Sequence, residues 1–219
     1  MMRKPFAILI SALCAALCGC GGGGGAPEPA PATPVIEFYG DSLTFGSING
    51  PDGTLTRLAV PPVRRAQELL GAAALCVDLS LPGATVADAL AGAPMMPFGA
   101  FAQHVSATAA STLVIRYGGA DALRGTPLPD FERDLGAMVT QAQAAGKTVL
   151  LVGVITLPGG ATDDYDLAVE RAADAHGAGF VDVRAVPGGP GDTADGTHPA
   201  QAWSDRITAA IVQHLQTHF

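Results

Sequence analysis

A serine, an aspartate and a histidine occupy positions in this sequence from which they could together hydrolyse an ester. Ser42 follows directly after an apolar run at residues 35–39, and Asp195 and His198 stand far downstream in an Asp-Gly-Thr-His-Pro segment. A serine hydroxyl is a weak nucleophile at neutral pH and needs a neighbouring base, which a carboxylate must orient. The three-residue step from Asp195 to His198 lets the carboxylate reach the imidazole. We therefore predict acyl transfer with Ser42 as nucleophile, His198 as base and Asp195 as its orienting group.

The elements that must position these residues alternate between short apolar strands and helices. Strands are predicted at residues 35–39, 76–81, 112–117, 148–155 and 179–183, and helices at residues 59–70, 84–90, 98–108, 130–145, 164–176 and 200–218. Apolar strands separated by helices predict a parallel sheet covered on both faces, hence an α/β fold. Ligands bind such sheets beyond the carboxyl ends of the strands, where the candidate residues fall. Loops at residues 47–62 and 92–101 are expected to shape an open, shallow substrate site.

Four segments of the chain resemble the sequence blocks of GDSL/SGNH-type serine hydrolases. They are Gly40-Asp41-Ser42-Leu43, Leu81-Pro82-Gly83-Ala84, Gly118-Gly119-Ala120-Asp121, and Asp195 with His198 before Pro199. The resemblance covers nearly all of residues 35–219. It implies a flavodoxin-like, three-layer αβα sandwich with a five-stranded parallel sheet. It also implies a Ser42-His198-Asp195 triad, an oxyanion hole built from the backbone N–H groups of Ser42 and Gly83, and no metal or cofactor.

The sequence departs from that family at Ala120, which stands where the family has an asparagine that donates to the oxyanion. Losing one such donor typically lowers kcat by about 10² to 10³. Three outcomes are open: a slow enzyme, a donor from elsewhere such as Asn49 or a water, or a domain that binds an acylated or glycan ligand without turning it over. Asp121 is interpreted as a carboxylate that fixes its loop. Arg116 either pairs with a carboxylate near the site or caps the sheet.

Composition limits the class of partner. The chain has 219 residues, with 20 acidic against 12 basic side chains and a formal net charge of −8. Nucleic-acid binders need a basic face, so this balance argues against a nucleic-acid partner. A hydrophobic content of 48% suits a single folded domain. The expected substrates are small-molecule, lipid or acylated-glycan esters, and no residue selects among them or fixes the acyl length.

The N-terminal segment resembles the export signal of a bacterial lipoprotein. A short basic region precedes an apolar stretch that ends in Leu-Cys-Gly-Cys, with Cys20 in the position that receives lipid. The expected organisation is a signal peptide at residues 1–19, a Gly/Pro-rich tether at residues 20–34 and the hydrolase-like domain at residues 35–219. The expected location is the cell envelope, anchored by lipid on the periplasmic face of the outer membrane. The alternative is a secreted protein with an ordinary signal.

Overall fold

Parallel strands form the central sheet of the computed structural model, which describes residues 32–189 and 191–218. The strands of this sheet are β1 (Val35–Gly40), β4 (Leu75–Asp78), β5 (Thr112–Arg116), β6 (Thr148–Val152) and β7 (Gly179–Val181), in the order β4-β1-β5-β6-β7. The register pairs Ile36 of β1 with Cys76 on one side and Thr112 on the other. The predicted five-stranded parallel sheet is therefore confirmed, although the predicted strands at 76–81 and 148–155 run past the paired residues.

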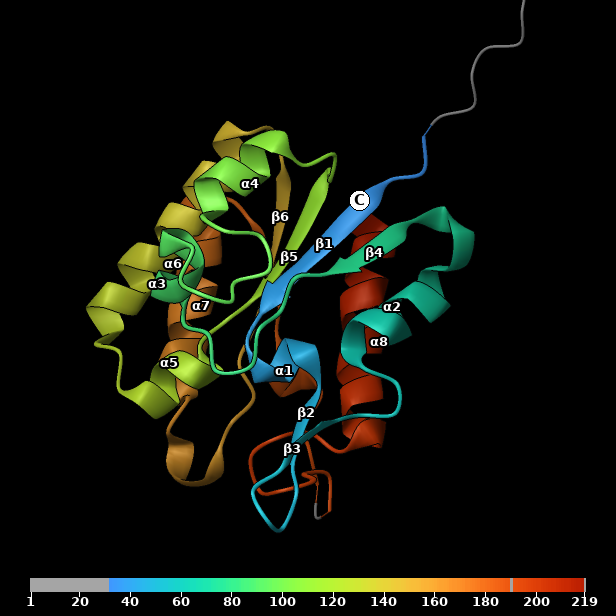
Figure 1. Cartoon of the computed structure of the whole chain (residues 1–219), viewed down its shortest axis with the longest axis vertical. Coiled ribbons are helices and arrows are strands. Elements are labelled where there is room, and N and C mark those ends of the chain that lie inside the picture. The colour runs from blue at the N-terminus through green and yellow to red at the C-terminus, as the bar shows by residue number, and fades with distance from the viewer. Residues whose placement is uncertain (1–31, 190, 219) are drawn as a thin grey trace, which may run out of the picture. The chain divides into compact units, whose positions relative to one another are not determined.

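Helices cover both faces of this sheet (Figure 1). Helices α2 (Pro62–Leu70) and α8 (Gln201–His218) pack together on one face, and α3 (Val86–Ala91), α4 (Phe101–Ala107), α6 (Leu128–Ala144) and α7 (Asp163–His176) lie on the other. This arrangement is the predicted three-layer αβα sandwich. Shorter helical segments are α1 (Ser42–Phe45), α5 (Gly119–Arg124), η1 (Gly71–Ala73), η2 (Pro158–Gly160) and η3 (Val183–Ala185).

Helix α6 shows how the sequence pattern forms the core. Its buried side chains include Phe131, Leu135, Met138 and Val139, which recur at the spacing of one helix face. Phe131 and Met138 are fully buried. The helix begins at Leu128, two residues before the predicted start. Pro129 fits this first turn because the N–H groups of a first turn have no acceptor within the helix, so the N–H that proline lacks is not missed.

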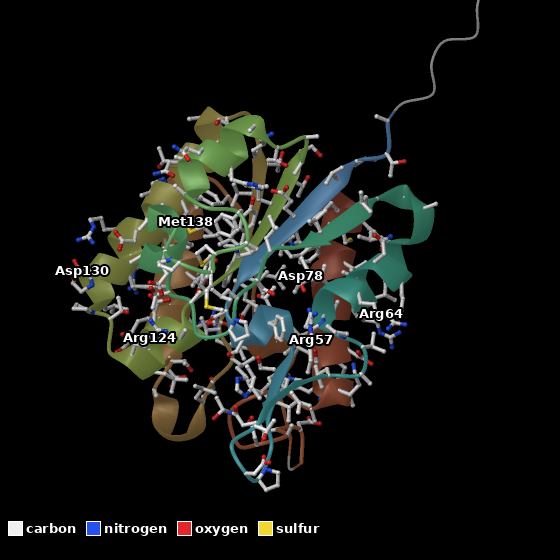
Figure 2. The ribbon with its side chains drawn as sticks, viewed as in Figure 1. Arg57, Arg64, Asp78, Arg124, Asp130 and Met138 are labelled. Atoms are coloured by element: carbon white, nitrogen blue, oxygen red, sulfur yellow. The ribbon has the colours of Figure 1, made fainter. Side chains whose placement is uncertain are left out.

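A β-hairpin occupies the segment that was predicted to be a loop at residues 47–62. Strand β2 (Ser47–Asn49) pairs antiparallel with β3 (Leu55–Arg57). Arg57 lies over the ring of Phe45, 4.0 Å from its centroid, and pairs with Asp78 at the end of β4 (Figure 2). The hairpin is thus held against α1. Helix α2 begins only at Pro62, because Pro61 before it is in an extended conformation.

The predicted signal peptide, Cys20 and the tether up to residue 31 lie outside the described residues. Thr33–Phe219 form one compact unit. Within the described part of the chain, no helix is both long enough and apolar enough to cross a membrane.

Candidate active site

The turn that carries Ser42 lies at the carboxyl end of β1. Asp41 caps the one-turn helix α1, and its Oδ1 accepts a hydrogen bond of 2.9 Å from the backbone N–H of Leu43. Gly46 ends the helix at a φ of 80°, a left-handed conformation that glycine adopts without strain, and its N–H bonds to the Ser42 carbonyl. These caps hold Ser42, which is half-buried, at the edge of the sheet.

Ser42, His198 and Asp195 lie in one chain of hydrogen bonds. His198 Nε2 is 3.0 Å from Ser42 Oγ, and His198 Nδ1 is 2.7 Å from Asp195 Oδ2. In Figure 1, α1 and the loop that leads into α8 both lie beyond the carboxyl end of β1, with the loop beside hairpin β2–β3. The structure therefore brings together the three residues that the sequence spacing selected, although Ser42 is separated from His198 by 156 positions.

Asp195 is surrounded by N–H donors. Its Oδ1 accepts from the backbone N–H groups of Thr197 (2.9 Å) and His198 (2.7 Å), and its Oδ2 accepts from the Asn49 N–H (2.6 Å) as well as from the imidazole. Burial raises the pKa of the Asp195 carboxyl, but these hydrogen bonds, that of His198 first, outweigh burial and hold the pKa well below its usual range. Asp195 is therefore a fixed negative charge beside the imidazole.

Asn49 enters this arrangement through its backbone. The structure places its N–H against Asp195 Oδ2, which also contacts His198 Nδ1. This contact engages the backbone N–H alone, and the role of Asn49 as a substitute oxyanion donor stays a prediction. Hairpin β2–β3 thereby orients the acid of the constellation. No sequence signal identifies such a contact, because every residue except proline supplies a backbone N–H.

Asp41 joins the Ser42 turn to the turn after β5. It is fully buried, and its Oδ2 accepts a hydrogen bond of 2.9 Å from the Ala120 N–H. Burial raises the pKa of the Asp41 carboxyl, against the lowering effect of its two N–H donors and of Arg116. The buried Arg116 lies below the turn, where its Nη1 is 3.4 Å from the Leu43 carbonyl oxygen. Burial lowers the pKa of Arg116 to about 10, so its guanidinium remains charged at neutral pH.

A second turn brings Gly83 alongside Ser42. The backbone N–H of Leu81 donates to the Gly40 carbonyl (2.9 Å), which fixes the segment after β4 against the end of β1. Gly83 has a φ of +76°, in the region that favours glycine. Among the described residues, the N–H groups of Ser42 and Gly83 have no protein acceptor, whereas that of Ala120 is bound to Asp41. Two backbone donors are thus available beside the serine.

Asp121 lies fully buried behind these turns. Its Oδ2 accepts from the Val86 N–H at 3.3 Å, and within the described part of the chain its Oδ1 has no partner. Burial raises the pKa of the Asp121 carboxyl to about 7, opposed by the Val86 hydrogen bond and reinforced by Asp41. The carboxylate ties α5 to the start of α3, as expected of a loop-fixing residue.

Two pockets flank the constellation. One, of about 360 Å³, contains Gly83, Met95, Met96 and Arg124 in its lining. Both methionines belong to the apolar loop at residues 92–101, and Met95 is 83% exposed whereas Met96 is buried. A larger pocket of about 610 Å³ lies beyond β6 and β7 and includes Gly196. Among the described residues, no group of three or more His, Cys, Asp or Glu side chains is arranged to hold a metal ion.

Comparisons with known proteins agree with this architecture. The structure of a carbohydrate acetylesterase from Sinorhizobium meliloti matches 85% of this chain and 100% of its own, at a TM-score of 0.70 and 17% identity. The inhibitor-bound aryl esterase of M. smegmatis gives the same coverage of both chains, a TM-score of 0.70 and 19% identity. An acetylxylan esterase from Geobacillus stearothermophilus matches 83% of this chain and 94% of its own at a TM-score of 0.64 and 20% identity. These likenesses establish a shared fold.

Among curated proteins, none matches the sequence significantly. A family model, however, matches residues 38–205, which span the segments of Ser42, Gly83 and His198. The chain belongs to the GDSL-like lipase/acylhydrolase family.

Proposed function

We propose that this protein is a serine esterase that hydrolyses esters with a short acyl group, such as O-acetyl groups. The observation that carries the proposal is the hydrogen-bonded chain from Ser42 Oγ through His198 to Asp195, at 3.0 and 2.7 Å. The 3.0 Å distance between Ser42 Oγ and His198 Nε2 lets the imidazole take the proton of the hydroxyl as the oxygen attacks.

The proposed reaction has two halves. Ser42 Oγ attacks the ester carbonyl carbon, its proton passes to His198 Nε2, and the carbonyl oxygen takes up the electron pair as an oxyanion. The Ser42 and Gly83 N–H groups donate to that oxygen. Collapse of the intermediate expels the alcohol, which takes the proton from His198. A water molecule then gives a proton to His198 and attacks the carbonyl carbon of the acyl-serine. Collapse of this second intermediate breaks the bond to Oγ, which takes the proton back from His198, so that the carboxylic acid and free Ser42 are released. Asp195 holds the imidazole and stabilises its protonated form.

The preference for short acyl groups rests on the pocket that contains Gly83 in its lining. The pocket beside Gly83 is apolar at the methionines and opens at Met95, so it suits a small acyl group better than a long enclosed chain. Two of the structural neighbours are named as acetylesterases of carbohydrates, which supports an acetylated glycan as the substrate class to assay first.

A fluorophosphonate probe tests for an activated serine without knowledge of the substrate. The purified full-length chain should be labelled, whereas the Ser42→Ala variant should not. Ser47→Ala is the matched control, because Ser47 is buried five positions away and its Oγ has no hydrogen-bond partner among the described residues. Hydrolysis of p-nitrophenyl acetate, butyrate and octanoate then ranks the acyl length. The absence of labelling in a folded protein would contradict the esterase proposal.

That negative result would favour a second function, the binding of an acylated or glycan ligand without turnover. The favouring observation is Ala120: its methyl group cannot donate, and its N–H is already bound to Asp41. Titration calorimetry of the Ser42→Ala variant with an acetylated xylo-oligosaccharide would separate the two functions, since binding without hydrolysis by the native protein fits only the second.

We further propose that the protein is lipid-anchored at Cys20 in the cell envelope. The supporting observation is the Leu-Cys-Gly-Cys sequence after an apolar stretch. Radioactive palmitate should be incorporated into the native chain and not into a Cys20→Ser variant. A secreted protein would incorporate none in either form.

A further inference from the structure

Arg124 lies next to the proposed oxyanion donor Gly83. It is the last residue of α5, one helical turn after Ala120, so both residues lie on the same face of the helix. Long helical side chains lean toward the helix N-terminus and cover the preceding turn. Arg124 Nη2 accordingly lies 3.5 Å from the point where a Cβ on Gly83 would stand. Figure 2 shows the side chain on α5.

An ion pair holds the guanidinium in this orientation. Arg124 Nη1 is 3.3 Å from Asp88 Oδ2. Asp88 is itself fixed at the start of α3, because its Oδ2 accepts from the Thr85 N–H (3.0 Å) and its own N–H donates to Thr85 Oγ1 (3.2 Å). A guanidinium has five N–H donors in one plane. Nη1 is therefore engaged by Asp88 while Nη2 lies beside Gly83.

Ala120 supplies no donor on this side of the site. Ala120 contributes neither a side-chain donor nor a free N–H, since its N–H is bound to Asp41. We propose that Arg124 is a catalytic residue that completes the oxyanion hole, with its Nη2 donating to the ester carbonyl oxygen together with the N–H groups of Ser42 and Gly83. This inference rests on the proposed esterase function. A charged donor strengthens its hydrogen bond as the oxygen becomes anionic, so it acts mainly on the transition state.

Kinetics of the full-length chain on p-nitrophenyl acetate, a neutral ester, test the role. Arg124→Met should lower kcat by about 10² to 10³, the usual effect of removing one oxyanion donor, with KM nearly unchanged. Arg133→Met is the matched control, because Arg133 is also an exposed arginine paired with aspartates, Asp130 and Asp134, but belongs to α6. Its kcat should equal that of the native chain. Arg124 is 58% exposed, so its replacement should leave the melting temperature unchanged.

A rescue experiment makes the assignment specific. Adding Ala120→Asn to the Arg124→Met variant should raise its kcat at least about tenfold, because an amide donor then replaces the guanidinium. In the native background Ala120→Asn should change kcat far less, since Arg124 already donates. The proposal would be overturned if the effects of Ala120→Asn and Arg124→Met on the activation free energy were additive. Two residues that donate to the same oxygen must have coupled effects.

Two further results separate this inference from the function on which it rests. If hydrolysis depends on Ser42 but Arg124→Met retains the native kcat, the inference is wrong and the esterase proposal stands. The same holds if Arg124→Met only raises KM for carboxylate-bearing esters, which would make Arg124 a substrate-recognition residue. If the native chain neither hydrolyses esters nor reacts with fluorophosphonate, the esterase proposal is wrong and this inference is refuted with it.

Discussion

Replacing Asp195 by asparagine gives a strong test of the hydrogen-bond chain, because every contact of this carboxylate is to a donor. Oδ1 accepts from the N–H groups of Thr197 and His198, and Oδ2 accepts from Asn49 and the imidazole. An amide has one oxygen and one NH₂ group. Whichever way the amide is oriented, its NH₂ group replaces an oxygen that accepts two hydrogen bonds in the native protein. The change therefore damages the site in either orientation.

The two orientations have different costs. With NH₂ toward the imidazole, His198 must present an unprotonated Nδ1, so its Nε2 carries the proton and cannot take one from Ser42. In a serine protease this tautomer error lowers kcat by about 10⁴. With NH₂ toward the loop, the N–H groups of Thr197 and His198 lose their acceptor, at about 1–3 kcal/mol for each buried group. We expect Asp195→Asn to lower kcat by about 10³ to 10⁴.

Steady-state hydrolysis of p-nitrophenyl acetate and thermal unfolding measure the two costs separately. Asp192→Asn is the matched control, because Asp192 also accepts a backbone N–H, that of Gly189 at 2.7 Å, but has no contact with His198. The control should retain the native kcat. If Asp195→Asn retained kcat within about tenfold of the native value, the imidazole would not depend on this carboxylate and the reasoning would be refuted.

The remaining predictions concern the support of the site. The Asp121 carboxyl, with its pKa raised to about 7, binds its proton more tightly folded than unfolded. The free energy of unfolding should therefore fall as the pH rises from about 4 to about 7. In the Asp121→Asn variant, the free energy of unfolding measured by urea denaturation should depend less on pH across that window. The same pH dependence in the variant and the native protein would contradict the assignment. Gly40→Ala should lower the free energy of unfolding by about 1–3 kcal/mol, since its Cβ would collide with the Thr44 side chain and the Arg116 carbonyl; normal stability would show that the turn relaxes. Gln201→Ala should cost about 1–2 kcal/mol, because it removes both hydrogen bonds to the Val60 backbone (3.1 and 2.8 Å), and calorimetric melting tests it.

The sheet and its long helices could be predicted from the sequence because their residues carry a periodic signal. Strand β5 (Thr112–Arg116) is buried at every position, and its run of β-branched and apolar residues is the pattern that predicts a buried strand. Helix α6 is identified by its apolar face. Ser42 and His198 could then be placed at one edge of the sheet, because ligand sites of such sheets lie at the carboxyl ends of the strands. The geometry of the candidate site was therefore largely predictable, and the catalytic roles stay predictions.

The parts that were missed depend on tertiary contacts. Strands β2 and β3 each span only three residues around a turn with Gly50 and Gly53, too short for a periodic pattern. Their hairpin is fixed by the contacts of Arg57 with Phe45 and Asp78 and by the contact of the Asn49 N–H with Asp195. Helices α1 and α5 are similarly short. The link from Asp41 to Ala120 carries no sequence signal, because the two residues come from different parts of the chain.

The contact between Asn49 and Asp195 also provides a spectroscopic reporter. Asn49 is exposed, and its N–H points out of the hairpin to Asp195 Oδ2 at 2.6 Å. Its amide hydrogen is therefore shielded from exchange with solvent deuterium by Asp195 of the candidate site. Exchange at this one amide measures how often the Asp195 loop separates from the hairpin without global unfolding. Covalent occupation of Ser42, by holding His198 in place, should slow that exchange, so the integrity of the site can be followed at a single amide.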